Sequence, residues 1–279
     1  MGRLSKQISI VRLGKLFLIF GFVSYLILCG GMAIFQRSFL YFPTNDSSSQ
    51  VDQMALSANL QRWTNSAGQP IGFKRISAKQ PAEGSILLMY GNGSTAVDSA
   101  HYADDIQAVA PMDVYVMEYP GYEDRAGRPS QSSFFQAGED AFQSIPTNHP
   151  IYLVGESLGS GTASYLAGTF SNRVAGIVLF SPFNSVTGVA QYQYPILPVR
   201  LLLIDRFSSE EYLQNYHGKV CITVDGGDTI VPERFGLRLY NSYNGPKKLW
   251  EFKNAGHTQI TGSISEFWNE VIGFWQNTR

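Results

Sequence analysis

A serine at a predicted junction of strand and helix constrains the fold of this chain more than any other feature. Residues 151–154 form a short apolar run, and residues 158–170 are rich in Ala, Leu and small side chains. The sequence Gly-Glu-Ser-Leu-Gly between them therefore indicates a strand, a sharp turn and a helix. Such a turn strains the serine backbone, and Gly155 and Gly159 would relieve the crowding around Ser157. The same residues could also form an ordinary glycine-rich turn.

The N-terminal region predicts a membrane-spanning helix. Residues 16–36 contain no charged side chain, and a helix of that length reaches about 30 Å, the thickness of the hydrocarbon core of a bilayer. A cleavable signal peptide is the alternative, but the apolar run is long and lacks the small residues of a cleavage site. We therefore expect a retained anchor.

Charges around the predicted span indicate its orientation. Residues 1–15 carry basic side chains and no acid, whereas Arg37 and then acids from Asp46 onward follow the span. The positive-inside rule predicts a cytoplasmic basic tail and an extracytoplasmic domain, periplasmic or lumenal, in a single-pass membrane protein. The basic residues of the tail are Arg3, Lys6, Arg12 and Lys15.

Composition excludes several classes of function. The formal net charge is −1, and no basic stripe occurs beyond the tail, so nucleic acid is not an expected partner. The four histidines are scattered and no CxxC or HExxH motif occurs, so no metal site is expected. Cys29 lies in the predicted span and Cys221 in an apolar run, which argues against a disulfide framework.

Beyond residue 70, apolar runs of strand length alternate with longer amphipathic stretches. We expect strands at residues 71–77, 86–90, 114–119, 151–154, 176–180, 220–224 and 249–252. We expect helices at residues 99–109, 132–145, 158–170, 232–241 and 264–276. Continuous apolar strands separated by helices predict an α/β fold with a mostly parallel sheet covered on both faces. We assign this domain to residues 70–279.

Two segments depart from this alternation. Residues 37–69 include a polar tract at 44–50, which predicts a tether between the anchor and the domain. Residues 182–216 contain an apolar, proline-containing stretch. An insertion after a strand can form a short cap over the C-terminal edge of a sheet, where ligands bind in open α/β folds. The segment could instead pack as a helix beside the core.

A catalytic serine needs a base within hydrogen-bond reach, since its neutral hydroxyl is a weak nucleophile. At a turn of this kind the acid and then the histidine follow the serine along the chain. Only His217 and His257 follow Ser157. His217 precedes a predicted strand, whereas His257 lies in a loop directly after one, so His257 is the candidate base.

The orienting acid is expected in the loop after the strand at 220–224. Asp225 and Asp228 both lie there. Asp228 is the better candidate because Asp225 is close enough to the strand end to serve as a turn residue. A single loop Asp or His usually has a structural or solvated role, but the required order after successive strands favours a Ser157, Asp228, His257 triad.

An oxyanion hole needs backbone N–H donors near the serine. Asn92 or Gly93, in the loop after the strand at 86–90, can supply one donor, and Leu158 can supply the other. Leu158 is the residue that follows the candidate nucleophile. The two donors would then approach the reacting carbonyl from opposite sides.

The same glycine-rich loop supports a rival interpretation. Gly91, Gly93 and Ala96 form a GxGxxA pattern after a strand, and Glu118 ends the next strand. This spacing imitates a dinucleotide-binding fingerprint with its ribose-binding acid, as in an oxidoreductase. The rival explains neither the serine turn nor the downstream Asp and His.

From residue 37 to the C-terminus the chain resembles the α/β-hydrolases, and within them the membrane-anchored abhydrolase-domain serine hydrolases. The residues that carry the resemblance include Ser38 to Pro43, Glu118 to Tyr122, Arg128 to Ser130, Gly155 to Gly161, Ser181 to Phe183, Leu197 to Arg200, Asp205 to Phe207, Asp228 and Gly256-His257.

The resemblance implies an α/β-hydrolase fold and hydrolysis of acyl esters or thioesters, including lysophospholipids and lipidated cysteines, without a cofactor. It implies Ser157 as nucleophile, His257 as base and Asp228 as orienting acid, with residues 91–93 and Leu158 forming the oxyanion hole.

The chain departs from the family pattern at several places. Tyr90 stands where a His usually precedes Gly-Asn, and Val224-Asp225 replaces the usual His-Gly. The cysteine-rich tail of the depalmitoylating members is also missing, which argues against a protein depalmitoylase.

We therefore predict a serine hydrolase of the esterase, lipase or thioesterase type, anchored in a membrane. Its expected partner is a small-molecule or lipid acyl substrate. A non-catalytic member of the fold that uses its pocket for binding is the alternative from another functional class.

Overall fold

A computed structural model describes the backbone of residues 2–277 and the side chains of residues 12–277. The side chains of Arg3 and Lys6, on which the predicted orientation partly depends, lie outside the described residues. Within that range, a sheet in the order β1-β2-β4-β3-β5-β6-β7-β8 forms the centre of the molecule. Its strands are β1 (Gln61–Thr64), β2 (Pro70–Arg75), β3 (Gly84–Met89), β4 (Met112–Met117), β5 (Ile151–Glu156), β6 (Val174–Phe180), β7 (Lys219–Asp225) and β8 (Lys247–Phe252).

The sheet is mostly parallel, as the sequence predicts. Strands β4, β3, β5, β6, β7 and β8 pair in parallel, whereas β1 and β2 form an antiparallel edge. Strands β3 and β4 are buried along their whole length, which matches their continuous apolar sequences. All parallel strands end at one edge of the sheet, where loops can bring distant residues together.

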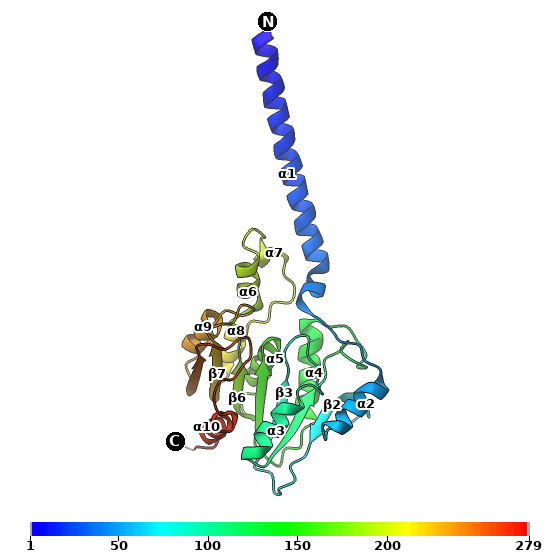
Figure 1. Ribbon diagram of the computed structural model, residues 1–279, viewed down its shortest axis with the longest axis vertical. Helices are drawn as coiled ribbons and strands as arrows, with labels where there is room; N and C mark the ends of the chain where they lie inside the picture. Colours follow the sequence, from blue (N-terminus) through cyan, green and yellow to red (C-terminus); the bar gives the residue numbers. More distant parts are fainter. Residues whose placement is uncertain (1, 278–279) are drawn as a thin grey trace.

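Helices cover both faces of the sheet (Figure 1). On one face α3 (Ala100–Val109) packs against α10 (Ile264–Gln276), and on the other α4 (Gln131–Gln143) packs against α5 (Leu158–Thr169). Helix α9 (Arg234–Ser242) contacts β7. Each of these helices was expected from the sequence within about two residues, which is the usual uncertainty of helix ends.

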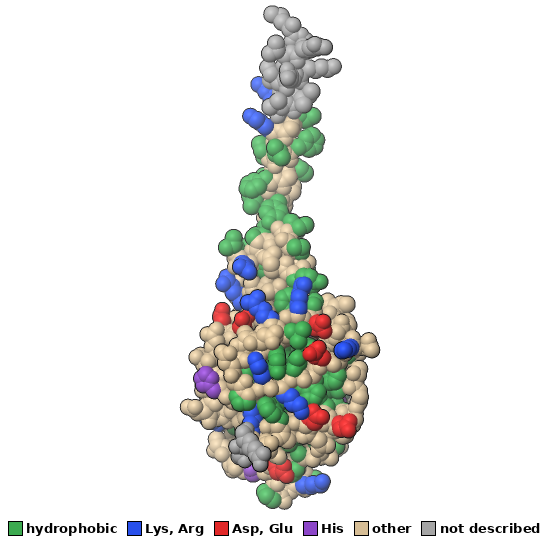
Figure 2. All heavy atoms as spheres, turned by 90° about the vertical axis from the view of Figure 1, so that its left-hand side faces the viewer, with side chains coloured by type: hydrophobic (Ala, Val, Ile, Leu, Met, Phe, Trp, Pro, Cys, Tyr) green, Lys and Arg blue, Asp and Glu red, His purple; other side chains and the backbone are tan. Residues whose placement is uncertain are grey.

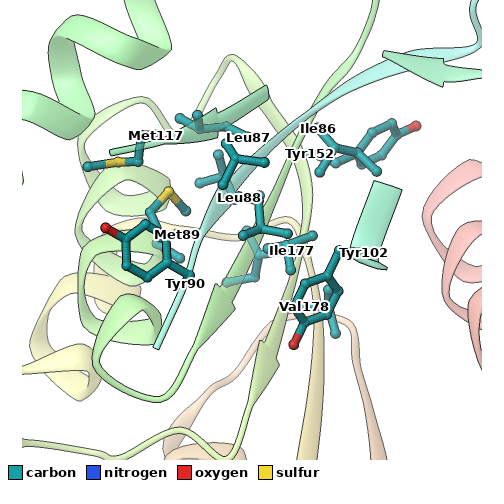
Figure 3. Packing of buried hydrophobic residues seen from close by; sticks show 14 of the residues in the cluster. Ile86, Leu87, Leu88, Met89, Tyr90, Tyr102, Met117, Tyr152, Ile177 and Val178 are labelled. Carbon is teal, nitrogen blue, oxygen red and sulfur yellow. The ribbon is translucent and has the colours of Figure 1, made fainter. Parts of the chain in front are cut away.

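The core lies between these layers. Figure 3 shows apolar side chains of β3, among them Leu87 and Leu88, packed with Ile177 and Val178 of β6. All four are fully buried. Dense packing of this kind holds the strand ends in fixed relative positions, because a packed interior tolerates little displacement.

The segment at 37–69 differs from a free tether. Helix α2 (Ser48–Ser57) and β1 lie within it, and Val51 and Ala55 of α2 are buried. Ser47 caps the N-terminus of α2, and its backbone N–H donates to the side chain of Gln50, 3.0 Å away. The polar tract that suggests a tether is thus in part a helix N-terminus whose apolar residues pack on the domain.

An extended helix and a raised insertion lie beside each other above the sheet (Figure 1). Helix α1 (Gly2–Leu40) is long and apolar enough to cross a membrane by length and composition. The insertion contains α6 (Val186–Gln193), α7 (Val199–Leu202), α8 (Ser209–Tyr212) and the 3-10 helix η1 (Leu213–Asn215). We call residues 182–216 the cap; α6 and α7 rise beside the domain end of α1.

Candidate active site

Ser157 lies at a sharp turn between β5 and α5. Its φ of 49° and ψ of −115° are strained for a residue with a side chain. A Cβ at Gly155 would lie 2.7 Å from the Cα of Ser160, and a Cβ at Gly159 would lie 2.7 Å from the carbonyl oxygen of Tyr90. The two glycines therefore give the turn the space that the sequence suggested.

Ser157, His257 and Asp228 form one hydrogen-bonded chain. The Nε2 atom of His257 lies 2.8 Å from Ser157 Oγ, and its Nδ1 atom lies 2.6 Å from Asp228 Oδ2. The residues follow β5, β8 and β7, whose C-terminal ends share one edge of the sheet. In the neutral tautomer that donates Nδ1–H to Asp228, Nε2 can accept the serine proton.

The Asp228 carboxylate is held by the backbone of its own loop. Its Oδ1 atom accepts N–H bonds from Ile230 and Val231, both at 2.8 Å, which leaves Oδ2 for His257. The side chain of Asp228 is 1% exposed and that of His257 18%. The acid is thus buried and fixed in orientation, whereas the imidazole edge remains open to a substrate.

Asp225 forms a hydrogen bond with Ser181 and not with His257, and sequence reasoning missed this bond. Its Oδ2 atom accepts a hydrogen bond from the hydroxyl of Ser181, and that hydroxyl accepts the N–H of Thr258 at 2.9 Å. Burial raises the pKa of Asp225, and the charge of Asp228 raises it further. Asp225 therefore supports the loop that carries His257. The Ser181-Pro182 turn after β6 gave no sequence signal for this link.

Two of the three predicted oxyanion residues lie close to the serine. Leu158 is the first residue of α5, where a backbone N–H has no partner within the helix. Asn92 and Leu158 line the same cavity as Ser157. Gly93 has a φ of 77°, which glycine adopts at low cost.

The side chain of Asn92 has a role that the sequence did not indicate. Its Nδ2 donates to the carbonyl of Leu40 at 2.7 Å, and its Oδ1 accepts the N–H of Phe42 at 3.0 Å and the hydroxyl of Tyr122 at 2.7 Å. These bonds fasten the end of α1 to the loop that carries the candidate oxyanion donors.

Glu118, the ribose-binding acid of the rival interpretation, is enclosed by protein. The residue is 3% exposed, and its carboxylate accepts bonds from the Tyr90 hydroxyl and from the N–H groups of Ala96 and Tyr119. Burial raises the pKa of Glu118 to about 7, although these hydrogen bonds oppose the shift. A carboxylate with these partners braces the loop at 91–96 and is not free to bind a ribose.

A cavity of about 370 Å³ opens directly above Ser157. Most of its lining is apolar and comes from α1, the cap and the loop after β7, with Asn92 and Leu158 beside the serine. Within residues 2–277 no group of three His, Cys, Asp or Glu side chains is arranged to hold a metal ion. The site can therefore offer a serine, an imidazole and a carboxylate to a ligand with an apolar part.

No protein-family model matches the chain. An uncharacterized protein of Mycobacterium tuberculosis is 31% identical over 178 residues, covering 62% of each chain. An uncharacterized membrane protein of Saccharomyces cerevisiae is 27% identical over 58% of this chain and 60% of its own length. Lysophosphatidylserine lipase ABHD12 of Bos taurus is 23% identical over 68% of this chain and 53% of its own length. The chain thus spans less than two thirds of these relatives.

Solved structures share the fold at low sequence identity. Esterase Pf2001 of Pyrococcus furiosus superposes with a TM-score of 0.60 at 14% identity, covering 84% of this chain and 94% of that one. A monoacylglycerol lipase of Paleococcus ferrophilus superposes with a TM-score of 0.56 at 19% identity, covering 77% of this chain and 98% of that one.

Proposed function

We propose that the chain is a member of the α/β-hydrolase superfamily and, within it, a membrane-anchored serine hydrolase of the abhydrolase-domain type that cleaves carboxylic esters or thioesters. The observation that carries the proposal is the hydrogen-bonded chain from Asp228 through His257 to Ser157 at the base of an apolar cavity. Acyl transfer by a serine requires a base that the serine can reach and a buried acid that orients this base.

The proposed reaction has two halves. Ser157 Oγ attacks the substrate carbonyl while His257 Nε2 takes the serine proton, and Asp228 stabilises the imidazolium through Nδ1–H. The negative oxygen of the tetrahedral intermediate accepts N–H bonds from Leu158 and from Asn92 or Gly93. The intermediate collapses to an acyl-serine, and His257 gives the proton to the leaving alcohol or thiol. Water, deprotonated by His257, then releases the carboxylic acid and restores the serine.

Acyl lipids are the proposed substrate class. The cavity above Ser157 is lined mostly by apolar side chains, with the candidate nucleophile among them. Such a lining suits a substrate that carries a hydrocarbon tail next to its reactive carbonyl. Among the relatives of this chain, one is a lysophosphatidylserine lipase and another a membrane protein, which supports the same class.

We further propose that residues 16–36 anchor the chain in a membrane, with residues 1–15 in the cytoplasm. Residues 37–69 would then join the anchor to the hydrolase domain at 70–279, which would lie in the periplasm or a lumen. Charges close to the span support this orientation, because Arg12 and Lys15 precede it without an acid and Arg37 is soon followed by Asp46.

Labelling with a fluorophosphonate probe tests the enzyme proposal. We expect the wild type to label and to hydrolyse p-nitrophenyl butyrate, and Ser157→Ala to lose both, with kcat/KM falling by about 10⁴-fold or more. Ser164→Ala is a matched control in the same helix, where the hydroxyl binds only the carbonyl of Ser160.

Two results would contradict the proposal. Absence of labelling in the folded wild type would favour a non-catalytic binding protein of the same fold. Equal labelling of wild type and Ser157→Ala would remove Ser157 from the reaction.

A further inference from the structure

The cap is fastened to α1 at successive levels along that helix. Farthest from the domain, the hydroxyl of Tyr25 donates to the carbonyl of Ile196 at 2.8 Å. Below it, Leu197 and Val199 of the cap bury Cys29. At the base, Arg37 pairs with Asp205 at 2.9 Å. The cap therefore lies alongside the last turns of α1 rather than below them (Figure 1).

These contacts place the cap at membrane depth. Charged residues bracket the apolar span closely, Lys15 at one end and Arg37 at the other, so the span has little freedom to slide along the membrane normal. From Gln36 to Tyr25 the helix rises about 16 Å, at 1.5 Å per residue. That distance is about half of a hydrocarbon core of about 30 Å. A cap that reaches Tyr25 would enter the adjacent leaflet.

A cap at membrane depth needs apolar side chains on its exposed surface, and the cap has large ones there. Ile196 is 79% exposed, Leu201 83% and Ile204 65%. Large apolar side chains gathered on one exposed surface usually mark a contact site. Figure 2 shows hydrophobic side chains along the stalk formed by α1, and lipid is the chemistry that fits both this exposed helix and the exposed apolar residues of the cap.

Protein side chains supply hydrogen-bond partners for backbone groups of the cap, as a lipid environment requires. Helix α7 is short, so several carbonyls around it lack partners within the helix. Gln36 of α1 donates to the carbonyl of Leu202 and accepts the N–H of Ile204, at 3.1 and 2.7 Å. Arg206 donates to the carbonyls of Leu203 and Arg200, at 3.0 and 3.2 Å. Irregular backbone is tolerated at membrane depth only when protein supplies such partners.

Charged side chains lie close to these apolar residues. Arg200, Arg206, Arg234 and Arg238 line one cavity together with Glu211 and Ile204, and Glu210 pairs with Arg238 at 3.2 Å. Figure 2 shows Lys and Arg side chains around the junction of the stalk and the globular part. Basic side chains at this level can reach lipid head groups while their stems stay among apolar atoms.

The cavity above Ser157 runs between α1 and the cap. Met32, Gln36, Phe39 and Leu40 of α1 line one side of it, and residues of α6 and α7 line the other. Leu40 lies beside Asn92 at the reactive end, and Met32 is about 12 Å farther along the helix axis. The anchor thus forms a wall of the cavity, and the wall leads from the serine toward the bilayer.

We propose that the cap lies within the leaflet next to the domain and that the channel between α1 and the cap takes up the acyl chain of a membrane lipid directly from that leaflet. That the bound acyl chain is then cleaved from its lipid depends on the proposed hydrolase function. The depth of the cap depends on α1 being the membrane anchor. Entry from the leaflet needs no transfer of the chain through water, which is unfavourable for apolar surface.

Two tryptophan substitutions on α1 test the channel in full-length protein reconstituted in phosphatidylcholine vesicles. Met32→Trp would narrow the membrane end of the channel, whereas Ile34→Trp adds the same bulk at a position that is 76% exposed. The measurement is the ratio of kcat/KM for p-nitrophenyl palmitate to that for p-nitrophenyl butyrate. We expect Met32→Trp to lower this ratio by about 10-fold or more and Ile34→Trp to leave both rates unchanged.

Depth is tested by fluorescence quenching, which needs no enzyme activity. A Leu201→Cys variant carries an environment-sensitive fluorophore in vesicles that contain lipids brominated along the acyl chain. Asn148→Cys, in the exposed loop before β5, is the matched control, and wild-type protein gives the background from buried Cys29 and Cys221. We expect strong quenching at residue 201 and none at residue 148.

Each outcome bears on one part of the proposal. Equal quenching at residues 201 and 148 would overturn the depth of the cap, even if Met32→Trp fails to fold. An unchanged palmitate to butyrate ratio in folded Met32→Trp would overturn the channel and favour entry from water. Loss of fluorophosphonate labelling in the wild type would instead count against the proposed function, while the quenching result stands by itself.

Discussion

The two ends of the cavity above Ser157 are formed by different kinds of structure. At the inner end, side chains are delivered by strand ends and held by hydrogen bonds, as Asp228 is by the N–H groups of Ile230 and Val231. At the outer end, short helices of the cap pack against α1 through apolar contacts and a few side-chain bonds to backbone. The proposed catalytic residues, which need fixed positions, therefore lie at the strand ends of the sheet. The proposed binding of a flexible hydrocarbon chain falls to the cap and α1.

The sharpest test of the inner end compares two aspartates at the C-terminal end of β7, Asp225 as its last residue and Asp228 in the loop that follows. Asp228→Asn should lower kcat by about 10⁴-fold, because an amide favours the wrong imidazole tautomer. Asp225→Asn should lower kcat by at most about 10²-fold, because the hydrogen bonds of Asp225 reach the His257 loop through Ser181 and Thr258. Hydrolysis of p-nitrophenyl butyrate measures both, with circular dichroism as a control for folding. A larger loss for Asp225→Asn would exchange the two assignments.

Glu118, which is buried beside the loop at 91–96, should make the stability of the protein depend on pH. Burial raises the pKa of Glu118 from its ordinary 4.5 to about 7. The folded protein then holds a proton that the unfolded chain releases, so this residue stabilises the fold fully below about pH 4.5 and loses that effect as pH rises through about 7. Relative to Glu118→Gln, the free energy of unfolding of the wild type should fall by about 3 kcal/mol across that window.

Thermal unfolding in detergent micelles at several pH values measures this difference between wild type and Glu118→Gln. Glu251→Gln, at an exposed position in β8, is the matched control and should follow the wild type. Parallel pH profiles for wild type and Glu118→Gln would show that Glu118 does not change its protonation on folding.

The smallest expected effect concerns the outer end, at the ion pair between α1 and the cap. Asp205 is buried, whereas the side chain of Arg37 is half exposed. Arg37→Gln leaves a buried carboxylate without its cation and should cost about 1 kcal/mol of stability, more than Asp205→Asn, which leaves only a hydratable guanidinium. Thermal unfolding of both single variants and the double variant measures this. A larger cost for Asp205→Asn would mean that Asp205 has a further role in the cap.

Sequence reasoning reached the parts of the fold that local pattern controls. Continuous apolar runs predicted the parallel strands, and the short turn at Gly155 to Gly159 predicted the junction of β5 and α5, which the structure contains. Helix α2 and strand β1 were not predicted, because a polar tract at 44–50 concealed a helix start, and β1 is only four residues long. A four-residue strand is stabilised by its partner β2 more than by its own sequence.

The sequence alone selected Ser157, Asp228 and His257 as candidates, because their order and their positions after successive strands are local properties of the chain. Their roles remain predictions, although the structure brings their side chains within hydrogen-bond distance. Only the tertiary structure could reveal that Asn92 fastens the end of α1 and that Asp225 braces the His257 loop through Ser181. The same holds for α1 as a wall of the cavity. These relations join segments tens to more than a hundred residues apart, and the packing of the whole sheet, not any local pattern, decides which distant side chains meet.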